Sequence, residues 1–471
     1  MKICVPTWLG AGLLAVSAAL LPPTAAAQAP QAAVQTIRAE TAEFTLANGM
    51  KLIVREDRRA PTVAHMIWYR TGSIDEQSGV TGVAHVLEHM MFKGTKTLAP
   101  GEFSQRVAAL GGRENAFTSK DYTAYFQQIE KSRLEQVMAL EADRMVNLVF
   151  DPEEFAREIR VVMEERRWRT DDQPLGLVHE ALNATAYMAH PYRHPIVGWM
   201  SDLQSMTVDD ARAWYEHWYA PNNAVMVVVG DVDAGEVRAL AEKHFGAIPR
   251  RPVPVTRPQH EPEQRGIKRV TVKAPAENPY VALAFKAPTL RDVEKDEEVH
   301  ALDVLAAILD GYDNARLPAR LVRTDRVANS VGAGYSNISR GPSLFVLNGT
   351  PAAGTTTAQL EKLLRAEVAR VAKEGVSEQE LQRVKAQLIA GQVYKRDSIF
   401  GQAMEIGIME MSGLSYRDID RIIEKLREVT AEQVQAVARK YFHDDNLTVA
   451  TLVPLPLTEK KEPAPPAGLR H

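Results

Sequence analysis

Residues 85–89 read H-V-L-E-H and place two histidines and a glutamate close together. Histidines four residues apart share one face of a helix, so both imidazoles can reach one metal ion. Glu88 lies beside His89, where its carboxylate could take a proton from water activated by that metal. The order H-x-x-E-H is the inverse of the more common zincin motif and is associated with metallopeptidases. The spacing therefore predicts metal-assisted hydrolysis, with His85 and His89 as ligands and Glu88 as the catalytic base.

The residues around this motif predict a buried helix. From position 83 to 92, every residue apart from His85, Glu88 and His89 is apolar, and a helix that is apolar on all sides lies inside a protein. Gly94 follows as a residue that can end the helix. The alternative to a metal site is a core helix whose histidines are held by hydrogen bonds, because unpaired buried polar groups are costly.

A second helix, expected to begin after Asp151, offers a third ligand. Asp151 is a favourable N-cap, Pro152 suits the first helical position, and acidic residues follow. On a helical wheel of about 100° per residue, Glu158 and Glu165 fall inside the apolar stripe, whereas Glu164 faces solvent. The stripe also contains Phe155, Ile159, Val161 and Val162. A buried carboxylate needs a cation or hydrogen-bond donors; without the histidines, a structural salt bridge would be the simpler interpretation.

With these residues in place, the chain resembles the pitrilysin (insulinase) family of zinc peptidases, which includes the mitochondrial processing peptidase β subunit. In that family H-x-x-E-H is followed by E-x6-E, whose second Glu is the third zinc ligand. Glu158 and Glu165 fit this pattern, and Glu165 lies 76 residues after His89. The family segment N-A-x-T-x-x-D-x-T-x-Y matches residues 115–125, and the likeness runs from about residue 40 to 455. The resemblance implies one Zn²⁺ per chain, held by His85, His89 and Glu165.

The resemblance also implies a fold and further roles. The expected fold is α+β, with two homologous α/β repeats of the LuxS/processing-peptidase-like metallohydrolase type that face each other as a clamshell. Glu158 would orient a histidine or the ligand helix. Asn115 and Ala116, which precede an apparent strand at 122–128, would bind a substrate that adds as a strand to an exposed edge. The alternative for Asn115 is an Asx turn after the glycines at 111–112.

Internal similarity predicts two homologous halves. The chain length agrees with this, because 471 residues exceed what one hydrophobic core normally holds. Thr207 and Thr430 each open a helix that leads into a strand, at 224–230 and 447–453. Residues 63–66 and 281–284 look like equivalent strands, and the duplicate of the motif helix, about 300–310, has no H-x-x-E-H. We expect a peptidase domain with the zinc site at 40–248, a stiff Pro-rich linker at 249–266, a homologous domain without a zinc site at 267–455, and a disordered tail at 456–471.

The amino terminus is predicted to be a signal peptide at residues 1–27. Lys2 precedes an apolar run at 8–21, and Ala25, Ala26 and Ala27 form an A-x-A site, with cleavage after Ala27. The run is shorter than the about 20 residues of a spanning helix. The single cysteine, Cys4, leaves with this segment, so the mature chain has no disulfide. We therefore expect a periplasmic or secreted bacterial protein; an uncleaved anchor is the alternative.

Composition and motifs together leave three classes of function. A formal net charge of −4 gives no electrostatic case for nucleic acid or an anionic membrane as partner. The first class is a zinc endopeptidase that cuts peptides or unfolded segments in an enclosed cleft. The second is a non-catalytic or structural subunit of the same fold, and the third is a peptide-binding module without turnover. Non-catalytic members of the family typically lack intact ligands, whereas this chain retains all four motif residues.

The second half lacks a pair of donors that the resemblance leads us to expect. Peptide hydrolysis needs donors for the oxyanion that develops on the scissile carbonyl. Self-sufficient family members supply them from an Arg and a Tyr, but Val322 and Asn329 stand at those positions here. We therefore expect the catalytic subunit of a heterodimer, whose homologous partner supplies the Arg/Tyr pair. The alternative is a chain that works alone, with a substitute among Arg320, Arg323 and Tyr335.

Overall fold

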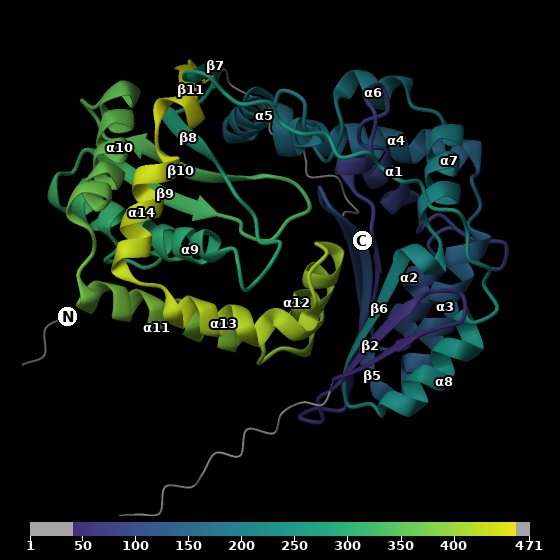
Figure 1. Ribbon diagram of the computed structural model, residues 1–471. Helices are drawn as coiled ribbons and strands as arrows, with labels where there is room; N and C mark the ends of the chain where they lie inside the picture. Colours follow the sequence, from purple (N-terminus) through teal and green to yellow (C-terminus); the bar gives the residue numbers. More distant parts are fainter. Residues whose placement is uncertain (1–40, 458–471) are drawn as a thin grey trace, which may run out of the picture. The chain divides into compact units, whose positions relative to one another are not determined.

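The computed structural model describes residues 41–457. The expected signal peptide at 1–27 lies outside this range, as does all but the beginning of the expected tail at 456–471. The described residues form two mixed β-sheets, each covered by helices, so the predicted α+β class is confirmed (Figure 1). In this part of the chain, no helix is both long and apolar enough to cross a membrane.

The first sheet has six strands in the order β1-β2-β6-β3-β5-β4. Its strands are β1 (Thr41–Thr45), β2 (Lys51–Glu56), β3 (Thr62–Tyr69), β4 (Arg113–Thr118), β5 (Thr123–Glu130) and β6 (Ala224–Gly230). Strands β2 and β6 pair in parallel, and the other neighbours pair antiparallel. The central strands β3 and β6 are buried on both faces, which explains why their sequences are almost entirely apolar. Strand β4 lies at one edge.

The second sheet repeats the topology of the first. Its five strands follow the order β7-β11-β8-β10-β9, with β7 (Lys268–Pro275), β8 (Tyr280–Ala287), β9 (Ala328–Tyr335), β10 (Ser343–Pro351) and β11 (Leu447–Leu455). β7 and β11 pair in parallel, as β2 and β6 do. Strands β3 and β8 hold the same place in the two sheets, and so do β6 and β11. The structure thus confirms the strand equivalences that the sequence predicted.

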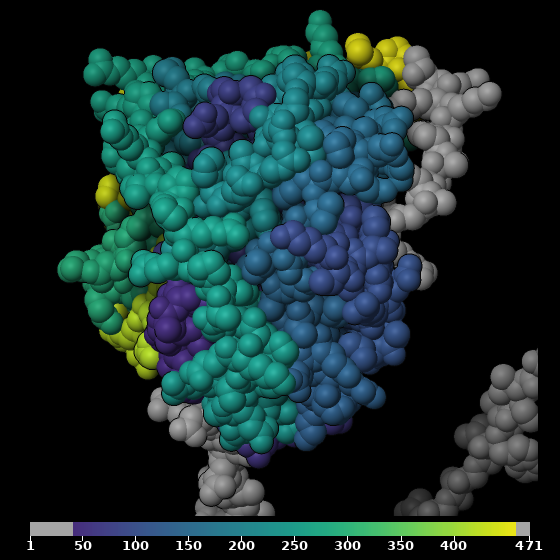
Figure 2. All heavy atoms as spheres, turned by 90° about the vertical axis from the view of Figure 1, so that its right-hand side faces the viewer, coloured from purple at the N-terminus to yellow at the C-terminus, as the bar shows by residue number. Residues whose placement is uncertain are grey.

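Most helices of the first half cover one face of the first sheet, and its buried core lies between them. They are α1 (Val83–Met90), α2 (Glu102–Ala109), α3 (Leu134–Asn147), α4 (Pro152–Arg166), α6 (Met200–Ser205), α7 (Val208–Trp218) and α8 (Ala234–Phe245). Side chains of this half, coloured blue to teal, form most of the surface seen in Figure 2. The second core involves α9 (Glu297–Asp310), α10 (Thr357–Glu374), α11 (Glu378–Lys395), α13 (Ile419–Glu428) and α14 (Ala431–Tyr441).

Each half also contributes one helix to the other half's sheet. Helix α5 (Pro174–Ala186) buries Val178 and Leu182 against β7, β8 and β11. Helix α12 (Ile399–Met411) packs Ile406 against β3 and β6 of the first sheet. Gly407 of α12 lies so close to Trp68 that an added Cβ would come within 2.0 Å of the indole Cε2. Figure 1 shows α5 beside β8 and α12 beside β6. The two halves therefore share buried surface and depend on each other.

Candidate metal centre

Helix α1 carries the H-x-x-E-H motif, and all eight of its residues are buried, as predicted. Its first turn is held by Glu76, whose carboxylate accepts hydrogen bonds from the backbone N–H groups of Gly82 (2.8 Å) and Ala84 (3.0 Å). A carboxylate at this place satisfies N–H groups that have no partner within the helix. This role of Glu76 was not predicted from the sequence.

Helix α4 presents the second set of candidate ligands and begins as predicted. The side chain of Asp151 accepts hydrogen bonds from the first turn, and Pro152 is the first helical residue. Glu158 and Glu165 are both buried, whereas Glu164 is exposed. The placement of Val161 in the buried stripe is wrong, because this side chain is 38% exposed. Val161 lies at the edge of the stripe on the helical wheel, and the helix turns that edge toward solvent.

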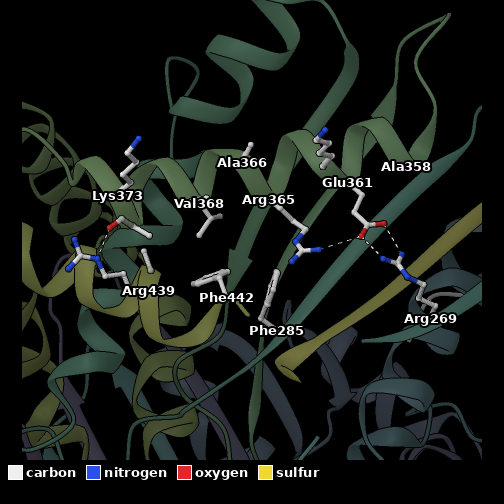
Figure 3. A pocket seen from close by; sticks show the side chains of 14 residues that line it. Arg269, Phe285, Ala358, Glu361, Arg365, Ala366, Val368, Lys373, Arg439 and Phe442 are labelled. Carbon is white, nitrogen blue, oxygen red and sulfur yellow. Dashed lines mark hydrogen bonds and ion pairs between the residues drawn. The ribbon is translucent and has the colours of Figure 1, made fainter. Parts of the chain in front are cut away.

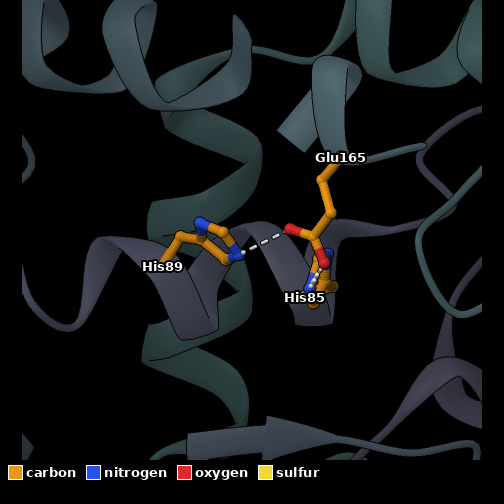
Figure 4. A group of neighbouring side chains, drawn as sticks. All are labelled: His85, His89 and Glu165. Atoms are coloured by element: carbon orange, nitrogen blue, oxygen red, sulfur yellow. Dashed lines mark ion pairs between the residues drawn. The ribbon is translucent and has the colours of Figure 1, made fainter. Parts of the chain in front are cut away.

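The two helices bring His85, His89 and Glu165 together (Figure 4). Their potential ligand atoms all lie within 4.8 Å of one another, and they form the one such group found in residues 41–457. His85 Nε2 is 3.6 Å from Glu165 Oε1, and His89 Nε2 is 3.3 Å from Glu165 Oε2. The sequence prediction that one site collects these residues therefore agrees with the geometry.

This donor set fits a zinc ion. Two imidazoles and one carboxylate are a common set for catalytic zinc, and they leave a fourth position for water or substrate. Burial alone would raise the pKa of Glu165, but contacts with His89, His85 and Arg169 lower it to about 2. Glu165 is therefore ionised at neutral pH, as a metal ligand must be.

Glu158 and Lys93 support His89 from the side opposite the cluster. Glu158 Oε1 lies 2.8 Å from His89 Nδ1, and Glu158 Oε2 lies 2.6 Å from Lys93 Nζ. Burial opposes the positive charge of His89, but the contacts with Glu158 and Glu165 outweigh burial and raise the pKa of His89 to about 9. A carboxylate on Nδ1 fixes the ring with Nε2 directed at the cluster. The structure thus places Glu158 where the resemblance implied.

Glu88 lies beside the cluster and contacts strand β4. Its Oε2 accepts a hydrogen bond of 2.6 Å from the Thr118 hydroxyl. Burial raises the pKa of Glu88, and the Thr118 hydrogen bond partly opposes that shift. A carboxylate with a raised pKa is a better proton acceptor near neutral pH. Thr118 belongs to the family segment at 115–125, but the sequence analysis did not assign it a role.

A pocket of about 440 Å³ opens beside the cluster, and every residue that lines it lies between 85 and 197. Asn115 and Ala116 line it from β4, where they pair with Phe126 and Tyr125 of β5. Asn115 and Ala116 precede the strand expected at 122–128, which the structure shows as β5, but they also lie in a strand of their own, β4, which was not predicted. The Asx turn is excluded for Asn115. The polar and apolar residues of 113–118 do not alternate as those of a half-buried strand usually do, so β4 could not be predicted from this stretch.

The pocket is not lined by either of the second-half positions where an oxyanion donor was expected, nor by any of the three possible substitutes. Val322 lies in the π-helical segment η6 (Pro318–Thr324), and Asn329 lies in β9. The substitutes have other partners: Arg320 pairs with Glu367 at 3.2 Å, Arg323 donates to Asn314 at 3.0 Å, and the Tyr335 hydroxyl donates to the Pro288 carbonyl at 2.5 Å. The pocket instead contains the first-half cations Lys120, Arg169 and Arg193.

Arg169 lies closest to the cluster among these cations. It belongs to a π-helical turn, η3 (Arg167–Asp171), that directly follows α4. Its Nη1 lies 2.5 Å from Glu165 Oε1. Such π-helical turns occur frequently at functional sites. Arg169 follows Glu165 by four residues, a spacing that places side chains next to each other on a helix, so the sequence contained a signal for this contact.

A larger cavity, of about 880 Å³, lies in the second half between α10 and α14 (Figure 3). Phe285 and Phe442 line it, and Arg269 forms a bidentate ion pair with Glu361 at 2.8 Å. Its lining contains no histidine or cysteine and no group of metal-binding side chains. The chemistry therefore belongs to the smaller pocket in the first half.

Two mixed sheets with a buried pair of histidines and a glutamate on adjacent helices define a metallohydrolase type of site. The chain matches the model "Insulinase (Peptidase family M16)" over residues 51–198 and the model "Peptidase M16 inactive domain" over residues 205–388. The chain belongs to the insulinase (peptidase M16) family.

Relatives agree with this assignment along most of the chain. The chain is 31% identical to the "Zinc protease PqqE" of Helicobacter pylori, covering 87% of this chain and 92% of that protein. It is 28% identical to the "Uncharacterized zinc protease YmxG" of Bacillus subtilis, covering 85% and 96%. The crystal structure of a protease from Helicobacter pylori superimposes with a TM-score of 0.84 at 29% identity, covering 88% of this chain and all of that one. The names of these relatives support a peptidase that uses zinc.

Proposed function

We propose that this protein is an exported zinc endopeptidase that hydrolyses peptides or unfolded segments in an enclosed cleft. The observation that carries the proposal is the convergence of His85, His89 and Glu165 beside Glu88, in a pocket with an edge strand in its wall. We assign the peptidase domain to residues 40–248, the linker to 249–266 and the homologous domain to 267–455.

The geometry supports a division of labour among these residues. A zinc ion held by His85, His89 and Glu165 would lower the pKa of a water molecule to about 7 and polarise the scissile carbonyl. Glu88 takes the proton of the attacking water and delivers it to the leaving amine. Glu158 holds the His89 ring in the orientation that directs Nε2 to the metal.

Substrate binds along strand β4 in this proposal. The outer edge of β4 pairs with no strand of the described chain, so its backbone groups are available to an extended peptide. Asn115 and Ala116 lie on this strand within the pocket. A peptide added here passes Thr118 and the carboxylate of Glu88, which brings its backbone to the catalytic base.

A Glu88→Gln variant tests the proposal. We expect it to retain one zinc ion per chain and to lose cleavage of an unstructured peptide substrate, because it keeps the ligands and removes the base. Glu153→Gln, an exposed change on α4, serves as the control and should leave both properties unchanged. Zinc is measured by elemental analysis and cleavage by mass spectrometry. A wild-type chain that binds peptides and zinc without cleaving them, alone or with a homologous partner, would instead identify a peptide-binding or structural subunit.

We further propose that the chain is the catalytic subunit of a heterodimer whose homologous partner supplies an Arg/Tyr pair. The support is that every residue lining the pocket comes from the first half, while Arg320, Arg323 and Tyr335 have other partners. The test is an assay of the pure chain with and without its co-expressed homologue. Activity that appears only with the homologue supports the heterodimer, and full activity of the single chain contradicts it.

We also propose export through a signal peptide cleaved after Ala27. The order of a charged residue, an apolar run and an A-x-A site supports it. Amino-terminal sequencing of protein from the native host should yield a chain that begins at Gln28. A chain that begins at Met1 or Lys2 would contradict export with cleavage.

A further inference from the structure

The wall of the candidate active-site pocket contains a lysine that has no carboxylate partner. Lys120 lies in the turn between β4 and β5 and lines the pocket. Its Nζ donates to Asn183 Oδ1 at 3.2 Å and lies 4.8 Å from the ring centroid of Tyr192 and 5.8 Å from that of Tyr187. Within residues 41–457, no Asp or Glu oxygen lies within 4.0 Å of this ammonium as an ion pair. The neighbours of the Lys120 ammonium are therefore two aromatic rings and one amide, which are all uncharged.

The adjacent carboxylate does not neutralise Lys120. Asp121 accepts a hydrogen bond from the Tyr192 hydroxyl on one oxygen and, at 3.0 Å, one from the Arg340 backbone N–H on the other. Burial lowers the pKa of Lys120 to about 8, and the charge of Asp121 opposes that shift only in part. An enclosed ammonium without a counter-ion gains more from a new carboxylate than an exposed one does.

A second cation of the same pocket also has no carboxylate partner. Arg193 lies in the 3₁₀ turn η4 (Pro191–Arg193) and lines the pocket. Its Nη1 donates to the Met188 carbonyl at 3.1 Å, and its Nε approaches His194 Nε2 at 3.5 Å. The guanidinium therefore has neutral partners only, and its charge remains available to a ligand.

Three further charged residues of the lining have partners of opposite charge, and the carboxylate of Glu88 accepts a hydrogen bond from the Thr118 hydroxyl. Glu180 forms two hydrogen bonds with Arg166, at 2.8 and 3.0 Å, and Arg169 contacts Glu165. Lys120 and Arg193 are therefore the cations of the lining that have no carboxylate partner. A carboxylate that entered the pocket would find positive charge there that no other acidic group neutralises.

We propose that Lys120, Asn183 and Arg193 form a subsite for an acidic side chain of the peptide substrate, so that the enzyme prefers Asp or Glu near the scissile bond. This inference rests on the proposed peptidase function and names its substrate class. The subsite carboxylate accepts hydrogen bonds from the Lys120 ammonium and the Arg193 guanidinium while the backbone lies along β4. Charge-assisted hydrogen bonds of this kind are roughly twice as strong as neutral ones.

The test uses pairs of internally quenched peptides that differ by Glu or Gln at one position, with that position moved through the residues flanking the scissile bond. We expect kcat/KM for the Glu peptide to exceed that for the Gln peptide by roughly 10- to 100-fold at one position. The ratio should fall close to one in Lys120→Met and remain partly in Lys120→Arg. Lys131→Met, which removes an exposed lysine paired with Asp231 outside the pocket, should leave the ratio unchanged. Using the ratio cancels any general loss of activity in a variant.

A binding measurement separates this inference from the proposed function. Glu88→Gln protein should bind the Glu peptide more tightly than the Gln peptide in fluorescence anisotropy, and Lys120→Met in that background should remove the difference. Equal cleavage and equal binding of both peptides would overturn the subsite and leave the peptidase intact. Selective binding without any cleavage by the wild type, either alone or with its co-expressed homologue, would support the subsite and overturn the peptidase. A preference that disappears when the peptide carboxyl terminus is amidated would also overturn the proposal, because the terminal carboxylate would then be the ligand.

Discussion

The two halves of the protein share one arrangement of sheet and helices but bury different side chains between equivalent helices. In each half a helix that follows the central strand packs against a later helix: α1 against α4, and α9 against α11. Helix α4 buries Glu158 and Glu165, whereas α11 buries Leu381, Val384 and Lys385, the last of which donates to a backbone carbonyl. The later helix of this pair therefore packs against α9 without the buried carboxylates that α4 carries. The costly ionisable residues of the first half are explained by chemistry rather than by folding.

Helix α9, the second-half equivalent of α1, also carries ionisable residues on its inner side. His300 and Asp303 lie on α9, and burial raises the pKa of Asp303 to about 7. Asp303 accepts a hydrogen bond from Asn337 rather than joining a metal-binding group. Among the described residues, no such group includes α9. A buried histidine on this scaffold is thus not sufficient for a metal site.

The largest expected effect comes from replacing a histidine of the site in one half, compared with replacing a histidine of the equivalent helix α9 in the other half. His85→Gln should lose zinc, and peptidase activity should fall by roughly 10³-fold, since the metal contributes several kcal/mol to the transition state. His300→Gln should retain zinc and activity in the folded fraction. Elemental analysis and peptide cleavage measure both variants. Equal zinc loss in both would mean that the first-half histidine is not specifically a ligand.

A smaller effect is expected from the residue behind His89. Glu158→Gln weakens the contacts with His89 and Lys93, so zinc affinity should fall by roughly 10- to 100-fold. Competition with a chelator of known affinity measures this change. Glu154→Gln, on the same helix but paired with exposed Arg157, is the matched control and should leave the affinity unchanged. An unchanged affinity in Glu158→Gln would assign that residue a purely structural role.

The packing of α12 on the first sheet gives a third prediction. Gly407→Ala should lower the free energy of unfolding by about 1–3 kcal/mol, because the new Cβ meets the buried indole of Trp68. Gly391→Ala on α11, where an added Cβ meets nothing within 4 Å, should raise it by up to about 1 kcal/mol. Urea unfolding measures both. A neutral Gly407→Ala would show that α12 does not seal the first sheet.

Local periodicity predicted the site better than it predicted the fold. The i, i+4 spacing on α1 and the wheel of α4 placed His85, His89 and Glu165 correctly, because both depend on helical geometry within one or two turns. The wheel failed at Val161, which lies at the edge of the buried stripe. The contact of Arg169 with Glu165 was not predicted either, although the two residues are four apart, the spacing at which side chains meet on a helix.

Contacts between residues far apart in the chain could not be predicted from the sequence. The exchange of α5 and α12 between the halves was not predicted, because periodicity shows which face of a helix is buried but not which sheet buries it. Asn115 gave no strand signal because the polar and apolar residues of 113–118 do not alternate. The enclosure of Lys120 depends on Tyr187 and Tyr192, more than sixty residues away in the chain. Such neighbours become visible only in the folded structure.

The central claim is that one buried carboxylate of α4 completes a zinc site with two histidines of α1, and zinc content in two adjacent variants tests it most directly. Glu165→Gln and Glu164→Gln make the same chemical change one residue apart, on the buried and exposed faces of one helix. Elemental analysis of purified protein should show a sharp loss of zinc in Glu165→Gln and one ion per chain in Glu164→Gln. Equal zinc content in the two variants would contradict the assignment of Glu165 as a ligand.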